Sequence, residues 1–220
     1  MKIDKKIIED IKQEAKEHLI KGDSSHDWSH IERVYNSAIK IAKEEKANLD
    51  VVKIAACLHD IGRNEEIKSN GKICHAEKGA EIAKKMLSKY DIDERLVENI
   101  IHCILSHRNR NNYKPKTIEA KIIFDADKLD SIGAVGIARD FLFAGIYNAP
   151  LYTGREKEIL KNADNYAYTR DDTALLEYYY KLSKIKDKII TKTAKKVARD
   201  RHNYMKEFFE RFNKEIKGIL

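Results

Sequence analysis

The sequence predicts an all-α protein, a single-domain helical bundle, and three observations support that fold class. Apolar residues recur at i, i+3, i+4 and i+7 over most of the chain, for example at Ile31, Val34, Tyr35 and Ala38. No sustained alternation of apolar and polar residues competes with this helical period. Only two prolines and nine glycines interrupt the 220 residues, so few positions force a long helix to end.

Each predicted helix ends where turn-forming residues gather. These breaks fall at residues 21–24, 62–71, 109–115 and 148–172. The last break is the longest irregular segment; a loop of this length tends to be functional or mobile, so this is the place to look for a lid. The expected helices span residues 3–20, 27–46, 50–60, 75–88, 93–107, 115–129, 131–145, 171–186 and 191–216.

The length and the lack of a linker predict one domain. A chain of 220 residues suits a single domain, and it contains neither a low-complexity linker nor a repeat of roughly 20 to 50 residues. Cys57, Cys74 and Cys103 form no CxxC pair, which favours free thiols in a reducing compartment, the cytoplasm. We therefore expect one domain over residues 1–220.

The net charge of +7 is spread along the chain. Basic and acidic residues interleave at helical spacing, as in residues 40–46, which is typical of a solvated, salt-bridged surface. The apolar runs are far shorter than the roughly 20 residues needed to cross a bilayer, and residues 1–20 resemble no signal or transit peptide. We expect neither a membrane nor a nucleic acid as a partner, and a homo-oligomer is left open.

Residues that commonly bind metals cluster in the first half of the chain. Six of the eight histidines lie within residues 26–107. His59 and Asp60 end an apolar helical run, His30 opens an amphipathic helix, and Asp127 follows a strongly apolar run. A lone buried carboxylate costs several kcal/mol, so a cation should meet Asp127. Two imidazoles and two carboxylates suit a divalent first-row metal or magnesium, with open positions for water and a phosphate oxygen.

Three motifs resemble the HD-domain metal-dependent phosphohydrolases, whose signature is His, then His-Asp, then a distant Asp. Residues 26–34 (HDWSHIERV) resemble the first motif, 57–62 (CLHDIG) the second and 125–139 (DADKLDSIGAVGIAR) the third. The third motif and the tail at 191–209 are similar to a small single-domain subgroup that includes nucleoside-triphosphate pyrophosphatases. The resemblance covers nearly the whole chain. It implies one HD phosphohydrolase domain over residues 1–220, with a metal-binding core at about 26–145 and C-terminal helices at about 171–216.

The resemblance also implies roles for individual residues. By position, the metal ligands are His30, His59, Asp60 and Asp127. The ion is divalent, and manganese, magnesium, nickel and cobalt stay open, as does the number of ions. Asp60 is also expected to hold the attacking water and accept its proton. Asp130, at i+3 from Asp127, is the alternative base, or it orients a ligand imidazole.

Histidines and cations near the motifs are the candidate substrate-binding residues. His26 lies one helical turn before a predicted ligand, and its alternative role is a helix cap. His75 and His107 lie in segments where some HD proteins carry ligands for a second metal or contacts to phosphate. The carboxylates at 65–66 are weaker candidates, because a loop carboxylate is usually solvated. The cations expected to hold phosphate oxygens, each with an ordinary salt bridge as its alternative, are Arg33, Lys128 and Arg139.

The resemblance implies hydrolysis of a nucleoside or deoxynucleoside triphosphate between its α and β phosphates, which yields a monophosphate and pyrophosphate. Other activities on the same scaffold are the first alternative: 5′-nucleotidase, triphosphohydrolase or cyclic-nucleotide phosphodiesterase. The second alternative is a non-catalytic, metal-containing bundle that binds RNA or protein. The sequence offers no aromatic-interleaved basic face to favour that reading, so a small-molecule nucleotide is the expected substrate.

Overall fold

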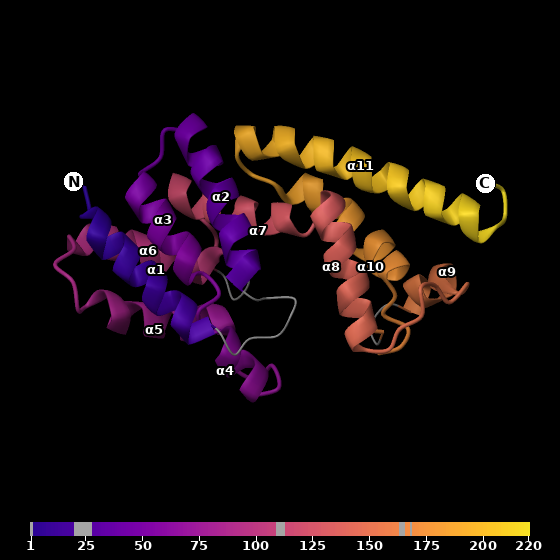
Figure 1. Ribbon diagram of the computed structural model, residues 1–220, viewed down its shortest axis with the longest axis horizontal. Helices are drawn as coiled ribbons and strands as arrows, with labels where there is room; N and C mark the ends of the chain where they lie inside the picture. Colours follow the sequence, from indigo (N-terminus) through magenta and orange to yellow (C-terminus); the bar gives the residue numbers. More distant parts are fainter. Residues whose placement is uncertain (1, 20–27, 109–112, 163–165, 168) are drawn as a thin grey trace. The chain divides into compact units, whose positions relative to one another are not determined.

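The computed structural model describes residues 2–19, 28–108, 113–162, 166–167 and 169–220, and these residues contain helices and no strands. The predicted all-α class is therefore confirmed. The helices, drawn in Figure 1, are α1 (Lys5–Leu19), α2 (Trp28–Glu44), α3 (Leu49–Leu58), α4 (Arg63–Lys68), α5 (His75–Leu87), α6 (Glu94–Ser106), α7 (Ile118–Asp130), α8 (Gly133–Ile146), α9 (Glu156–Ile159), α10 (Ala174–Tyr180) and α11 (Lys192–Ile216), with 3-10 helices η1 (Leu160–Asn162) and η2 (Leu182–Lys188).

Three predicted segments differ from the structure. The break expected at 62–71 contains α4, and the irregular segment expected at 148–172 contains α9 and η1. The single helix expected at 171–186 is interrupted at Lys181, whose φ of −129° departs from helical geometry, and continues as the 3-10 helix η2. Short helices of this kind bury few residues, so their hydrophobic period is too brief to stand out in the sequence.

The contacts divide the chain into two compact units. The first comprises residues 1–127 and 190–194, and the second comprises 128–189 and 195–220. The single domain predicted over 1–220 stays a prediction beside this division. No helix in the described part of the chain is long and apolar enough to span a membrane. The three cysteines are free.

In the first unit, α1, α2 and α6 all pack on α3 (Figure 1). Seven of the ten residues of α3 are buried, which explains its continuous apolar sequence. The helix begins at Asn48, whose side chain accepts hydrogen bonds from the amides of Asp50 and Val51. The carboxylate of Glu119 on α7 binds the Asn48 amide at 2.8 Å and Asn99 on α6 at 3.0 Å. This network fixes the position of α3 against α6 and α7.

Gly62 allows the chain after α3 to approach α5 closely. A Cβ atom at this position would lie 2.3 Å from the carbonyl oxygen of His75 and 2.5 Å from the amide nitrogen of Gly79, both backbone atoms that cannot move aside cheaply. Only glycine fits such an approach. The contact brings the residues that follow α3 next to the first turn of α5.

Asp125 ties the short returning segment to the first unit. Its buried carboxylate accepts hydrogen bonds from the amides of Ile190 and Thr191 at 2.8 and 2.7 Å, and from the Thr191 hydroxyl at 2.7 Å. The amide of Thr193 donates to Glu45 at 2.7 Å. Residues 190–194 thus belong to the first unit although more than 60 residues separate them from Asp125 in the sequence.

The second unit has an aromatic core. Phe141 on α8 contacts three phenylalanines of α11, and Tyr178 on α10 stacks on Phe209 with ring centroids 4.2 Å apart. The φ of Gly133 is +82°, and a Cβ there would press on the side chain of Arg201, which donates to the Leu129 carbonyl at 2.6 Å. The aromatic contacts and this turn join α8, α10 and α11.

Candidate metal centre

The four residues predicted as metal ligands all lie in the first unit. His30 is the third residue of α2, His59 and Asp60 follow the last residue of α3, and Asp127 lies in the last turn of α7. His30, His59 and Asp60 are buried, and the side chain of Asp127 is 19% exposed. Three elements distant in the sequence therefore bring the four residues together, with Asp127 on the side open to solvent.

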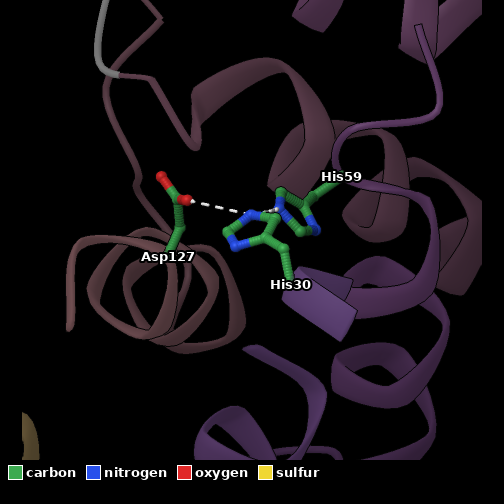
Figure 2. Close-up of side chains that lie close together, drawn as sticks. All are labelled: His30, His59 and Asp127. Carbon is green, nitrogen blue, oxygen red and sulfur yellow. Dashed lines mark hydrogen bonds and ion pairs between the residues drawn. The ribbon is translucent and has the colours of Figure 1, made fainter. Parts of the chain in front are cut away.

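His30, His59 and Asp127 form one group that could hold a metal ion. The Nε2 atom of His30 lies 3.3 Å from Nε2 of His59 and 3.6 Å from Oδ1 of Asp127. Figure 2 shows His30 between the other two side chains, with dashed lines to each. The Oδ2 atom of Asp60 lies 3.8 Å from His30 Nε2 and 4.0 Å from His59 Nε2. The predicted ligands thus converge on one small volume. We call His30, His59 and Asp127 the first trio.

Asp60, His75 and His107 form a second group of this kind, which we call the second trio. The Nε2 atoms of His75 and His107 lie 3.0 Å apart, and they are 3.1 and 3.5 Å from Oδ1 of Asp60. All three residues are buried. The sequence assigned His75 and His107 to substrate binding, and the structure places both beside a predicted metal ligand. Asp60 therefore directs one oxygen at each trio.

Hydrogen bonds on the far side of the rings orient two of the histidines. His59 Nδ1 lies 2.8 Å from the carbonyl oxygen of Ala56, and His107 Nδ1 lies 2.6 Å from that of Ile104. A carbonyl oxygen has no proton to give, so Nδ1 is the donor in both rings. In the neutral ring, Nε2 then carries a lone pair that faces the trios. Second-partner bonds of this type are typical of histidine metal ligands.

The ionisation states of the site favour cation binding. Burial lowers the pKa of His107 to about 4, which keeps this imidazole neutral at physiological pH. Burial alone would raise the pKa of Asp60, but the positive charge of Arg63, with smaller contributions from the neighbouring histidines, lowers it well below its usual value. A neutral imidazole and an ionised carboxylate are the forms that bind metals.

The donor atoms present fit a divalent metal. The imidazole nitrogens and carboxylate oxygens of the two trios approach one another within 3.0 to 3.6 Å. Ligand bonds of about 2.1 Å at angles of about 90° to 110° place neighbouring donor atoms roughly 3.0 to 3.4 Å apart. Nitrogen and carboxylate oxygen donors without thiolates suit manganese, cobalt, nickel or zinc, and carboxylate and water suit magnesium.

Glu66 connects His75 of the second trio to two arginines. Its carboxylate lies 2.6 Å from His75 Nδ1, and it accepts hydrogen bonds from Arg63 at 2.7 Å and Arg108 at 2.8 Å. Burial opposes ionisation, but the hydrogen bond and charge of His75 and the two arginines lower the Glu66 pKa to about 2. Arg63 also donates to both oxygens of Asp60, at 3.0 and 3.1 Å. Two guanidinium groups therefore stand next to the second trio.

Sequence reasoning missed part of this network. Arg63 and Arg108 were not among the expected cations, and Glu66 was considered only a weak candidate. Arg63 and Glu66 are one helical turn apart directly after the His-Asp pair, which is a signal the sequence did contain. Arg108 is 42 residues from Glu66, and no local pattern connects them.

The other predicted site residues have different surroundings. Arg33 donates to the hydroxyl of Ser29 one turn earlier on α2, at 2.8 Å. Asp130 accepts a 2.7 Å hydrogen bond from Arg139 within the second unit, to which Lys128 also belongs. The roles of these four residues toward a substrate stay predictions. His26 lies outside the described residues.

The comparisons with known proteins identify the family. Residues 27–132 match the HD domain. The uncharacterised protein YpgQ of Bacillus subtilis is 34% identical over 200 residues, which cover 89% of this chain and 87% of YpgQ. The chain therefore belongs to the HD-domain family.

Solved structures agree with this assignment. The crystal structure of Bacillus subtilis YpgQ in complex with ADP is similar with a TM-score of 0.73 and 30% identity over 97% of both chains. An HD-superfamily hydrolase from Bacillus thuringiensis is similar with a TM-score of 0.72 and 32% identity, over 96% of this chain and 97% of that one. The fold is that of the HD-superfamily hydrolases, and the His and Asp clusters give it a candidate centre for a divalent metal.

Proposed function

We propose that this protein is a metal-dependent phosphohydrolase that cleaves nucleoside or deoxynucleoside triphosphates to a monophosphate and pyrophosphate. The observation that carries the proposal is the pair of trios that meet at Asp60, with imidazole nitrogens and carboxylate oxygens directed at a common volume. This donor set leaves room for water and a phosphate oxygen.

Within the proposal, His30, His59, Asp60 and Asp127 hold a divalent ion. Such an ion, when bound, lowers the pKa of its water, aligns that water with phosphorus and shields a phosphate oxygen. The histidines contribute fixed neutral nitrogens because backbone carbonyls hold their rings, as at His59. Asp127, the most exposed of the four, lies where substrate can approach.

The low pKa of Asp60 shapes its part in the reaction. A carboxylate that is ionised this strongly accepts a proton weakly, so Asp60 orients the attacking water by accepting its hydrogen bond, and the proton of that water goes to a second carboxylate or to solvent. Asp130 is the alternative base, and its bond with Arg139 orients its carboxylate. Replacing each aspartate separately by asparagine distinguishes the two assignments through the pH profile of turnover.

The substrate brings several negative charges that need cations. Arg63 and Arg108 lie beside the second trio, where their guanidinium groups already bind carboxylates. Arg33, Lys128 and Arg139 are the further candidates from the sequence. Pyrophosphate is a good leaving group, so the reaction does not demand a strong general acid.

A bound nucleotide in a relative supports the choice of substrate. The YpgQ crystal structure contains ADP, and that protein matches this chain over 97% of both lengths. A site that accepts a nucleoside diphosphate has room for a base, a sugar and at least two phosphates. We therefore expect a nucleotide with more than one phosphate to be the substrate here.

The test is a metal-reconstituted activity screen on the full chain. Chelated protein is supplied with manganese, magnesium, nickel or cobalt and with a panel of nucleoside mono-, di- and triphosphates, and the products are separated by ion exchange. Reactions in ¹⁸O-labelled water locate the bond that breaks, because attack at the α phosphorus places the label in the monophosphate. His59→Ala is the inactive variant, and His18→Ala, outside both trios, is the matched control.

Each product identifies one reaction. Labelled monophosphate with unlabelled pyrophosphate, lost in His59→Ala and kept in His18→Ala, is the expected result. Free phosphate from a monophosphate indicates a 5′-nucleotidase, and tripolyphosphate indicates a triphosphohydrolase. The absence of turnover with every ion contradicts the proposal and favours a metal-containing binding protein.

A further inference from the structure

A second candidate site lies in the first unit, in a cavity between α1 and α2. Both helices pack on α3, while direct contact between them is slight. This leaves a cavity of about 280 Å³ whose floor is formed by the buried side chains of Ile31 and Cys57. The remaining lining residues are Lys12, Trp28, Glu32, Tyr35 and Asn36.

Three residues that line this cavity carry hydrogen-bond donors. The Lys12 ammonium lies 5.0 Å from the centre of the Tyr35 ring. Burial, with the nearby Cys57 and Glu9, raises the pKa of Tyr35 to about 12, so its hydroxyl keeps its proton. Among the residues that the structure describes, Lys12 has no carboxylate partner, and neither the Tyr35 hydroxyl nor the Asn36 amide has a hydrogen-bond partner. Such donors suit a ligand with anionic oxygens.

The cavity also offers an aromatic wall and one acceptor. Trp28 lies two helical turns before Tyr35 on the same side of α2, and its indole nitrogen donates to Glu32 at 3.0 Å. The Lys16 ammonium lies 5.8 Å from the centre of the Trp28 ring. A ligand that fits these groups carries an anionic oxygen for Lys12, a flat ring for Trp28 and a donor for Glu32. Inorganic phosphate has only the first of these features.

We propose that the cavity between α1 and α2 binds a nucleoside monophosphate, with its phosphate at Lys12, Tyr35 and Asn36 and its base against Trp28. The size agrees, since 280 Å³ lies just below the roughly 300 to 1,000 Å³ typical of sites for larger ligands. The choice of a nucleotide rests on the proposed function, whose organic product has this chemistry.

Two lining residues of the cavity are close in sequence to the histidines of the candidate metal centre. Ile31 follows His30 on α2, and Cys57 precedes His59 by two residues at the end of α3. A ligand in the cavity therefore contacts both helices that carry the first trio's histidines.

Trp28 is the only tryptophan of the chain, so its fluorescence reports on the cavity. AMP is the probe, titrated to millimolar concentration into the full chain, with adenosine and inorganic phosphate as partial ligands. We expect saturable quenching by AMP, and weaker binding of both partial ligands. Lys12→Ala should weaken AMP binding about tenfold or more, and Tyr35→Phe about threefold to tenfold. Lys5→Ala, on the exposed face of α1, is the matched control and should not change it.

A second series separates the cavity from the metal centre. Quenching by AMP should persist in Asp127→Asn and after chelation, because neither change touches the cavity. Loss of quenching in Asp127→Asn together with normal quenching in Lys12→Ala would place AMP at the metal centre and overturn the inference. The absence of any response to AMP overturns it as well. Failure of the proposed function is seen separately, as an absence of turnover in the product screen.

Discussion

Asp60 in the first unit and Asp140 in the second are both buried aspartates, but their surroundings are opposite. Asp60 is 2% exposed, lies within hydrogen-bond distance of Arg63 and His75, and has a lowered pKa. Asp140 is 8% exposed, and its Oδ2 atom has no hydrogen-bond partner among the described residues. Burial, with the charges of Glu177 and Asp172, raises the Asp140 pKa to about 9 despite the opposing charge of Lys181.

This comparison shows that burial alone does not mark a functional carboxylate. Burying a carboxylate raises its pKa unless charges and donors compensate. The first unit supplies that compensation and so keeps Asp60 ionised and available to a metal. Asp140 instead stays protonated at neutral pH. Isosteric Asp→Asn and Glu→Gln replacements separate these cases, since each keeps the shape and removes the charge.

Asp60→Asn should have the largest effect on activity. Asp60 directs one oxygen at each trio, so the variant weakens both. We expect turnover to fall at least about 1,000-fold, because losing several kcal/mol of charge stabilisation costs tenfold for each 1.4 kcal/mol. Steady-state kinetics measure the loss. The exposed Asp91→Asn is the matched control, and an Asp60→Asn enzyme within tenfold of wild type would contradict the central position of this carboxylate.

Asp127→Asn should damage the first trio and spare the second. We expect the tighter metal site to disappear, because the two guanidinium groups beside the second trio disfavour a cation there. Metal titration by calorimetry, with atomic absorption of dialysed protein, measures the affinity. The counterpart is Arg108→Ala, which should strengthen any binding at the second trio. Unchanged tight binding in Asp127→Asn would show that the second trio, and not the first, binds the metal more tightly.

Glu66→Gln should have an intermediate effect. The carboxylate is the acceptor for His75 Nδ1 and balances Arg63 and Arg108, so its loss frees His75 to rotate. Outer-shell changes of this type cost about 10- to 100-fold in metal affinity or activity. Kinetics across metal concentrations detect the loss. Glu65→Gln, at the neighbouring position, is the control, and equal effects of the two variants would argue against a specific role of Glu66.

Asp140→Asn should change stability and leave turnover intact. The folded-state pKa of about 9 lies above the unfolded value of about 3.9, so the carboxyl stabilises the fold below about pH 4 and this contribution is lost as the pH rises to about 9. Asparagine does not ionise. We expect the variant to be about 1 to 3 kcal/mol more stable than wild type at pH 8, with the difference shrinking toward pH 4. Urea unfolding at both pH values tests this, and a pH-independent difference would refute it.

Long periodic segments of the sequence predicted the fold well, and short segments did not. The expected helices at 75–88 and 93–107 correspond to α5 and α6 within one residue at each end. Their apolar positions recur over three turns or more, which is enough to distinguish a helix. The six residues of α4 bury no side chain fully, and its stability comes from packing on α5, a contact that no local pattern records.

The candidate metal centre also has one part that the sequence predicted and one part that it did not. His30, His59 and Asp127 were expected from motifs, and the structure brings them together. The second trio and its partners depend on Gly62, which lets the chain after α3 meet His75. A close backbone approach of this type is invisible in a single sequence, since a glycine after a helix also fits an ordinary helix end. The arrangement of His75 and His107 around Asp60 therefore had to come from the structure.

The hydrogen bonds of Asp125 to residues 190–191 have a consequence for how the protein is made. A ribosome delivers these residues only after it has synthesised most of the 220-residue chain. Until then, the carboxylate of Asp125 on α7 lacks three of its donors, and a buried carboxylate in that state costs several kcal/mol. The half of the chain that carries the candidate metal ligands therefore finishes folding late, and a gene fragment cut after residue 132 would not reproduce it.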